Sequence, residues 1–318
     1  MSTLSLPVAV SPRSGLTWTV LRLHRGTLWL WTAYVVLLAG VLLWAWGPGT
    51  SGLGLAGPCD PAVANECVAD GPTAGAFHYA LSFVDTFLSM LPAAAAVFAG
   101  GALIGRELES GTARLAWTQS VPPARWLTTK LALPALALVT GTTLLVVLRR
   151  QVAAAAPDLP QNRWFSGSFE VLGPVAIALP LLGLACGALM AFVHRRALTG
   201  AGLGLVLTVA LTMSAALLRP RLWPTETRVG TVEQNYLRFP GYLIEEGAVT
   251  SSGAHIPDPM CVGDAACVAE HHITGYYREG HPPSHFWPLQ LVETGLLLAV
   301  TALIVLATYG ILRRRVAR

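Results

Sequence analysis

The chain has 318 residues, of which 53% are hydrophobic and only 12% are charged, and its formal net charge is +4. Soluble domains carry about 25% charged residues, so this chain has about half the charge that a water-facing surface needs. The composition therefore excludes a soluble enzyme, a disordered protein and a small secreted domain held together by disulfides.

Residues 16–26 precede the first long apolar segment and repeat apolar side chains at helical spacing. Leu16, Val20 and Leu23 share one face, and Arg22 and Arg25 lie among them. This pattern predicts a short amphipathic helix on the inner surface of a membrane.

Six apolar segments are long enough to cross a membrane as helices. Lipid offers no hydrogen-bond partner to the backbone, so each segment is predicted to be helical. The predicted fold is an all-α membrane protein, with residues 1–318 forming a single transmembrane domain. In chain order the spans are residues 28–46, 80–104, 131–148, 171–193, 198–218 and 289–312.

The charged residues favour an orientation with both termini in the cytoplasm. In that orientation the inner segments hold 13 basic and two acidic residues, whereas the outer segments hold eight basic and 13 acidic residues. Because basic loops stay on the cytoplasmic side, we expect a multi-pass protein of the cytoplasmic membrane, in contact with its lipids. The long segment 219–288 is then outside, and its aromatic side chains fit either an interfacial belt or a ligand-binding cap.

Two cysteine pairs lie in the predicted outer segments: Cys59 with Cys67, and Cys261 with Cys267. An oxidising outer face favours a disulfide within each pair. A metal site is the competing interpretation, because segment 219–288 also holds five histidines. Their spacing matches no standard zinc pattern, so we expect no metal. The histidines are His255, His271, His272, His281 and His285.

The inner loop 105–130 contains the only two acidic residues of the inner segments, Glu107 and Glu109. Gly111 predicts the end of one helix, and Thr112 predicts the cap of a short cytoplasmic helix that runs to Gln119. Such a helix across the mouth of two spans could receive a push from a soluble partner. An ordinary charged turn that satisfies the positive-inside rule explains the loop equally well.

The loop reads Glu-x-Glu-x-Gly-Thr, then Pro, then Arg-x-x-x-x-Lys. Together with the amphipathic helix, the six spans and the large last outer segment, this motif resembles the type-2 permeases of ATP-binding-cassette transporters, especially actinobacterial members. The resemblance implies that loop 105–130 couples the spans to a cassette ATPase. The candidate coupling residues are then Glu107, Glu109, Gly111, Thr112, Arg114, Arg125 and Lys130.

The resemblance also implies two permease copies, identical or paralogous, above two ATPase subunits that bind ATP and magnesium. The chain itself lacks a phosphate-binding loop: Gly100 and Gly105 have the spacing, but Arg106 and Glu107 replace the Lys and Ser/Thr. The glycine pair instead predicts helix packing. We expect no intrinsic catalysis, no cofactor bound by this chain and no nucleic-acid partner.

Two acidic residues, Asp85 and Glu293, fall inside the predicted spans, near their outer ends. A carboxylate in a bilayer costs several kcal/mol unless it is paired or wetted. These residues could line an outer gate or a path for a cationic substrate, or simply reach water. Gly200, Gly202 and Gly204 predict close helix packing, either within one subunit or between two.

The predicted function is the permease subunit of an ATP-driven exporter that moves an amphipathic or hydrophobic compound outward. One alternative is an ion-coupled secondary transporter that uses Asp85 and Glu293, although no internal repeat supports it. The other is a membrane sensor or anchor whose outer segment 219–288 binds a ligand.

Overall fold

The computed structural model describes residues 25–57, 68–118, 121–159 and 162–316. Six helices in these ranges are long and apolar enough to cross a membrane, which confirms the predicted number of spans. The amphipathic helix predicted for residues 16–26 lies almost entirely outside the described residues. The six helices are α2 (Arg25–Trp44, continued by η1, Ala45–Gly49), α3 (Ala74–Phe98, continued by η2, Ala99–Leu103), α6 (Pro123–Ala155), α7 (Val175–His194), α8 (Ala197–Leu218) and α10 (Phe286–Val316).

α6 extends well beyond the apolar segment that predicted it. α6 begins eight residues earlier and ends seven residues later than the span 131–148. Its start is explained by Pro123, which fits the first turn of a helix because that turn needs no N–H donor. Its end carries Arg149 and Arg150 inside the helix instead of in an outer loop.

α7 is the central helix of the bundle, and 72% of its apolar window is buried. Small residues let its neighbours approach closely. A methyl group on Gly183 would overlap the backbone of Pro92 in α3, and one on Gly187 would overlap Ala96. α3, α6, α8 and α10 therefore pack around α7, whereas α2 packs against α6 and α3.

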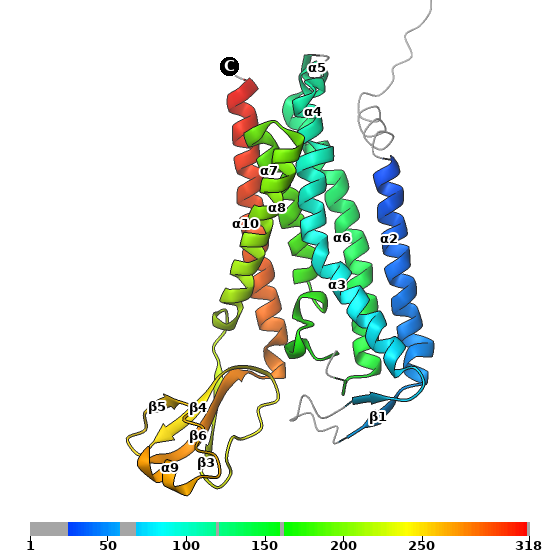
Figure 1. Cartoon of the computed structure of the whole chain (residues 1–318). Helices are drawn as coiled ribbons and strands as arrows, with labels where there is room; N and C mark the ends of the chain where they lie inside the picture. Colours follow the sequence, from blue (N-terminus) through cyan, green and yellow to red (C-terminus); the bar gives the residue numbers. More distant parts are fainter. Residues whose placement is uncertain (1–24, 58–67, 119–120, 160–161, 317–318) are drawn as a thin grey trace, which may run out of the picture.

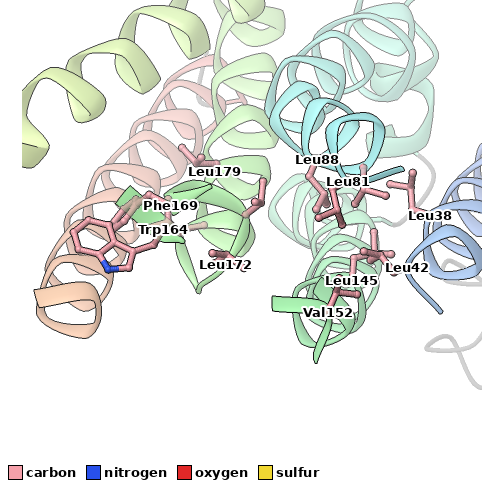
Figure 2. Close-up of a cluster of buried hydrophobic side chains, with 14 of the residues drawn as sticks. Leu38, Leu42, Leu81, Leu88, Leu145, Val152, Trp164, Phe169, Leu172 and Leu179 are labelled. Carbon is pink, nitrogen blue, oxygen red and sulfur yellow. The ribbon is translucent and has the colours of Figure 1, made fainter. Parts of the chain in front are cut away.

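The buried side chains form two main clusters within the bundle. The first (Figure 2) joins Leu38 and Leu42 of α2 to Leu81 of α3 and Leu145 of α6, and reaches Trp164 and neighbouring residues. The second contains Leu103, Leu127, Leu138, Phe192 and Leu312, together with Ala113 and Trp126. The second cluster therefore lies beneath the segment that joins α3 to α6.

Two antiparallel sheets lie outside the helices, so the prediction of an all-α fold was too simple. The four strands within segment 219–288 were missed because this segment is polar and rich in glycine and proline, without a long alternating pattern. A hairpin pairs β1 (Gly54–Ala56) with β2 (Val68–Asp70). The larger sheet has the order β3-β6-β4-β5, from β3 (Glu226–Thr231), β4 (Tyr242–Thr250), β5 (His255–Pro257) and β6 (Ile273–His281), with α9 (Ala265–Glu270) before β6.

The four-stranded sheet lies at one end of the bundle (Figure 1), and the beginning of α2 and the end of α10 lie at the other. Two short helices join α3 to α6 at this second end: α4 (Gly105–Glu109) and α5 (Thr112–Thr118). The segment with the coupling motif and the sheet are thus separated by the full length of the spans.

Candidate functional site

α4 and α5 form a sharp elbow at the end of the bundle that carries both termini of the described chain. The turn between them is made by Gly111, whose φ of +76° lies in the left-handed region that glycine adopts without strain. Its carbonyl accepts hydrogen bonds from the N–H groups of Arg114 and Leu115, which begins α5. The helix end predicted at Gly111 is therefore a turn that redirects the chain.

The role predicted for Thr112 was wrong in detail. Thr112 is the first residue of α5 instead of its cap. Its hydroxyl donates to the carbonyl of Glu107 at 3.4 Å and lies 3.0 Å from the hydroxyl of Ser110. The side chain therefore ties α5 back to α4.

An ion pair connects the elbow to the base of α6. The Nζ atom of Lys130 donates to Oε1 of Glu107 at 2.5 Å, and the Lys130 side chain is only 2% exposed. A buried ammonium group needs such a partner, because water no longer solvates it. Both residues were predicted to serve the ATPase, but the structure turns them toward each other.

The second acid of the motif has a different partner. Oε2 of Glu109 accepts a hydrogen bond from the backbone N–H of Ala197 at 2.9 Å. Ala197 is the first residue of α8, so the carboxylate lies at a helix N-terminus, where negative charge is favourable. Glu107 and Glu109 together fix α4 to two different spans.

α5 has one buried face and one exposed face. Ala113 is buried, and the ring of Trp117 packs edge-to-face on Trp126 of α6 with centroids 5.8 Å apart. Arg114 is exposed, and Leu115 exposes 59% of its surface. The exposed face therefore presents a positive charge beside an apolar side chain, a combination suited to a protein partner.

The basic residues of the motif divide between these two environments. Arg125 lies exposed in the first turn of α6, on the same end of the bundle as Arg114. Lys130, one turn further, is buried. Of the predicted coupling residues, Arg114 and Arg125 are thus accessible, while Glu107 and Lys130 brace the elbow from within.

Asp85, the first of the two acids in the spans, is paired with an arginine that the sequence prediction had assigned to an outer loop. The Arg149 guanidinium donates to both carboxylate oxygens of Asp85, at 2.9 and 3.1 Å. Arg149 is fully buried and also donates to Asn162, whose amide in turn donates to the carbonyl of Ala156. The pair therefore holds the chain that follows α6.

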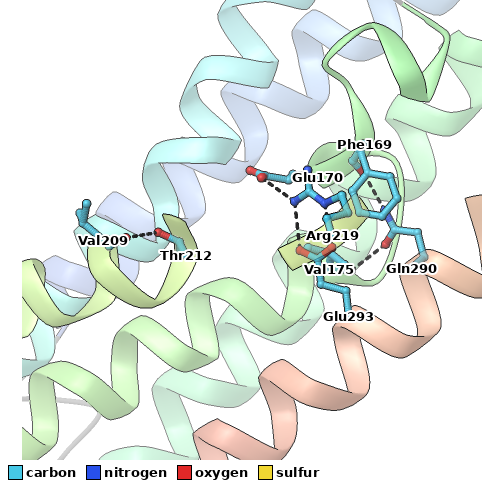
Figure 3. A network of polar contacts seen from close by, with 8 residues as sticks. All are labelled: Phe169, Glu170, Val175, Val209, Thr212, Arg219, Gln290 and Glu293. Atoms are coloured by element: carbon cyan, nitrogen blue, oxygen red, sulfur yellow. Dashed lines mark hydrogen bonds and ion pairs between the residues drawn. The ribbon is translucent and has the colours of Figure 1, made fainter. Parts of the chain in front are cut away.

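Glu293 has a matching arrangement (Figure 3). Arg219, the first residue of η6 (Arg219–Arg221), donates to both oxygens of Glu293 at 2.7 and 3.0 Å and to Glu170 at 2.8 Å. The guanidinium also lies 4.3 Å from the ring centroid of Phe169. One turn before Glu293, Gln290 donates to the Phe169 carbonyl. Both acids thus join segments far apart in the sequence.

These two arginines were missed because the predicted spans ended at the first charged residue. A usable signal existed, since Arg149 and Arg219 each follow a predicted span directly, near the outer ends where Asp85 and Glu293 lie. An acid and a base at similar depth in a membrane are expected to pair.

Of the three glycines predicted to allow close helix packing, Gly200 and Gly204 lie against neighbouring helices. A methyl group on Gly200 would lie 2.9 Å from the carbonyl oxygen of Gly100 in η2, and one on Gly204 would lie 2.7 Å from Gly187 in α7. Gly202 has open space around its Cα. Gly100, part of the apparent phosphate-loop spacing, therefore serves helix packing within the subunit.

Of the four cysteines predicted to pair, the structure describes two, Cys261 just before α9 and Cys267 within it. Cys261 and Cys267 form a disulfide in the structure, with Cα atoms 5.3 Å apart. Their sulfur atoms and a ring nitrogen of His271 lie within 4.8 Å of one another. A metal needs thiolates, which a disulfide does not offer, so His271 is left as a single ligand. Cys59 and Cys67 lie outside the described residues.

Residues 29–219 match the model of the family described as ABC-2 membrane transporter related, which covers more than half of the chain. The chain belongs to this family. Searches of curated proteins and of solved structures each found no match.

Membership in the ABC-2 family fits the six apolar helices and makes the chain a multi-pass membrane protein of the permease type. Permeases of this kind are typically non-catalytic, and membership implies an ATPase subunit as partner. The matched range ends at Arg219. It therefore includes the elbow and the first five spans, whereas the four-stranded sheet and α10 lie outside it.

Proposed function

We propose that this ABC-2 protein is the permease subunit of an exporter and that a separate cassette ATPase drives it by pushing on α5. The observation that carries the proposal is that the elbow is attached firmly to the spans and also has an exposed face. It is braced internally by Glu107, Glu109 and Trp117, and it exposes Arg114 and Leu115. A helix that transmits force needs both a stiff attachment and a free face.

In this proposal the elbow faces the cytoplasm, with both termini, and the four-stranded sheet lies outside. The excess of basic residues in the segments at the elbow end supports this orientation. ATP binding closes the ATPase subunits, which carry α5 with them. The bracing contacts of Glu107 and Glu109 then pass the movement to α6 and α8.

The substrate class we propose is an amphipathic or hydrophobic compound moved outward through a pathway shared with a second permease copy. The apolar surfaces of α2 and α8 are available for contact with a second permease copy or with lipid. Only 22% of the apolar window of α2 and 11% of that of α8 are buried within the chain. ATP and magnesium belong to the ATPase. This chain binds no nucleotide in the proposal.

The ion-coupled alternative gains no support from the geometry. A coupling carboxylate must be free to exchange a proton or cation, whereas Asp85 and Glu293 are each held by two arginine hydrogen bonds. The sensor alternative depends on segment 219–288, which lies at the end of the bundle opposite to α5.

The direct test is purification of the full chain from its native membranes in mild detergent. We expect a vanadate-sensitive ATPase to co-purify with it. The double variant Arg114→Glu, Leu115→Glu should lose most of that activity, because it reverses the charge and removes the apolar contact on the exposed face of α5. Val316→Glu, at the exposed end of α10, is the matched control and should retain it. Equal ATPase recovery from both variants would contradict the proposal.

A further inference from the structure

A cavity of about 300 Å³ lies between α2, α3, α6 and α7. Its lining includes residues from the first half of α2, the second half of α3 and the first half of α6, so it lies in the half of the bundle nearest to α5. The contributing side chains are almost all hydrocarbon, among them Leu30, Phe98, Pro134, Leu138 and Leu184. The cavity is therefore suited to an apolar occupant.

Two of its aromatic residues, Trp31 and Tyr34, carry a polar atom, and both atoms already have hydrogen-bond partners. Nε1 of Trp31 donates to the carbonyl of Ala137 at 3.1 Å, and the hydroxyl of Tyr34 donates to the carbonyl of Phe87 at 2.8 Å. The two rings stack with centroids 5.3 Å apart. A water molecule in the cavity would lack the two to four polar partners that it needs, so the site excludes water.

The packing of α2 explains why the space stays open. Leu38 and Leu42, in the second half of α2, are fully buried, whereas Trp29 and Leu30 in the first half expose 65% and 72% of their surface. Between them, Trp31 lies over Gly141 of α6, where an added methyl group would come within 2.5 Å of the indole. Trp31 is thus fixed against α6, and its ring forms one wall of the cavity.

The size and the position of the cavity point to its occupant. An apolar cavity of about 150 Å³ takes up benzene, so this one accommodates a longer hydrocarbon segment. α2 begins with the exposed Arg25, two residues before Thr27, which lines the cavity. A positive charge at the end of an apolar site in a membrane attracts an anionic lipid headgroup. We propose that the cavity binds one acyl chain of an anionic phospholipid, with Arg25 facing the phosphate.

Binding here would also stabilise the packing under the elbow. Leu103, Leu138 and Leu184 line the cavity, and they belong to the same buried cluster as Ala113 of α5 and Trp126 of α6. An acyl chain that fills the cavity adds contacts to that cluster and stiffens it. This regulatory consequence rests on the proposed coupling role of α5, whereas lipid binding itself does not.

The test uses the full chain in nanodiscs that contain phosphatidylglycerol with a photoactivatable diazirine in the middle of one acyl chain. After irradiation, labelled peptides are identified by mass spectrometry. We expect labelling to concentrate on α2 and on the first half of α6. Labelling spread evenly over all exposed helix faces, including α8, would overturn the proposal.

Two variants of α3 provide a matched pair. Ala94 is exposed and lines the cavity, so Ala94→Trp fills its mouth without disturbing the core. Val97, three residues further and 42% exposed, does not line it, so Val97→Trp is the control. We expect Ala94→Trp to lower labelling by about tenfold. This is the loss of affinity expected if the indole prevents about two CH₂ groups of the acyl chain from being buried. Labelling of Ala94→Trp at the level of Val97→Trp would overturn the proposal.

A second arm tests the headgroup. Labelling from phosphatidylglycerol should exceed labelling from the matching phosphatidylcholine, and Arg25→Gln should remove that difference. Arg106→Gln, an exposed arginine of α4 at the same end, should leave it unchanged. Equal labelling by the two lipids in the natural chain would overturn the role of Arg25. No ATPase is present in these measurements, so their failure is separate from failure of the proposed function.

Discussion

Lys130 and Glu107 lie 23 residues apart in the chain and form a partly buried ion pair between the elbow and α6. Between them the chain passes through α5 and returns to the bundle. The pair therefore closes the loop at its base, and α5 is held as a rigid projection. This contact is the structural condition for the coupling role that we propose.

Removing one partner of this pair should destabilise the protein strongly. Lys130→Met leaves the Glu107 carboxylate, which is only 17% exposed, without its counter-charge. We expect the free energy of unfolding to fall by about 3 kcal/mol. The double variant Glu107→Met, Lys130→Met should recover most of that loss, because it leaves no unpaired charge. Denaturant unfolding in detergent micelles measures both. A double variant as unstable as Lys130→Met would show that the ion pair is not what braces the elbow.

The network at the opposite end of the bundle should also carry stability. Arg219→Leu leaves Glu293, 2% exposed, without its two hydrogen bonds and also unpairs Glu170. We expect the melting temperature to fall by several degrees, since about 3 kcal/mol is lost when a buried carboxylate is left unpaired. Arg221→Leu, two residues later and exposed, is the control and should melt like the natural chain. Equal melting of the two variants would contradict a structural role for the Arg219 network.

His281 and His285 connect the segment that leads into the four-stranded sheet with the segment that leads out of it. Nε2 of His281 lies 3.0 Å from the carbonyl oxygen of Pro220, so it must donate there. Nδ1 of His281 then accepts from Nδ1 of His285 at 3.1 Å, and Nε2 of His285 lies 3.6 Å from Glu226. The contacts span η6, β3, β6 and η7 (Pro283–His285). Neutral His281 is the form that fits this arrangement.

The arrangement predicts acid sensitivity at the base of the sheet. Burial lowers the pKa of His281, and the nearby His285 lowers it further, against the opposing effects of the Pro220 carbonyl and Glu279. A lowered pKa means that the unfolded chain binds the proton better, so stability is lost as pH falls below about 6.5. The melting temperature should therefore drop between about pH 8 and about pH 5.5, and the drop should be smaller in His281→Gln. An identical pH dependence in the natural chain and His281→Gln would contradict this.

The disulfide beside α9 should have a modest effect because it closes a very short loop. Cys261 and Cys267 are six residues apart. For a loop this short, the chain-entropy treatment gives a stabilisation of the folded state of about 2 kcal/mol. We expect Cys261→Ser, Cys267→Ser to loosen the sheet while the bundle melts unchanged, and intact protein to resist alkylation at both positions. Mass spectrometry after alkylation with and without reductant checks the oxidation state. Alkylation of both thiols without reductant would contradict the disulfide.

The six spans could be predicted because lipid exposure imposes a simple requirement, about 20 consecutive apolar residues. The ends of the spans could not, because a charge was taken to end the helix. Arg149 stays inside α6 since Asp85, 64 residues earlier, neutralises it. Such a partner is visible only once the helices are placed side by side.

The motif in loop 105–130 predicted which segment to examine for coupling, but it did not separate the residues that brace the elbow from those that face outward. The opposite charges of Glu107 and Lys130 fit either a contact with the ATPase or a contact with each other. Only their positions on α4 and α6 show that they pair. Tertiary contacts of this kind, like those of Arg219 with Glu293, are not encoded in local periodicity. The exposed face of α5 follows from Ala113 and Trp117 facing inward.

The most direct measurement places a photo-crosslinking amino acid at position 115, in the exposed face of α5, and another at position 316, at the exposed end of α10. After irradiation of native membranes, the adducts are identified by mass spectrometry. We predict a cassette ATPase as the main adduct from position 115, in larger yield than from position 316. Absence of an ATPase adduct from position 115, in membranes where the protein is active, would contradict the proposed coupling role of α5.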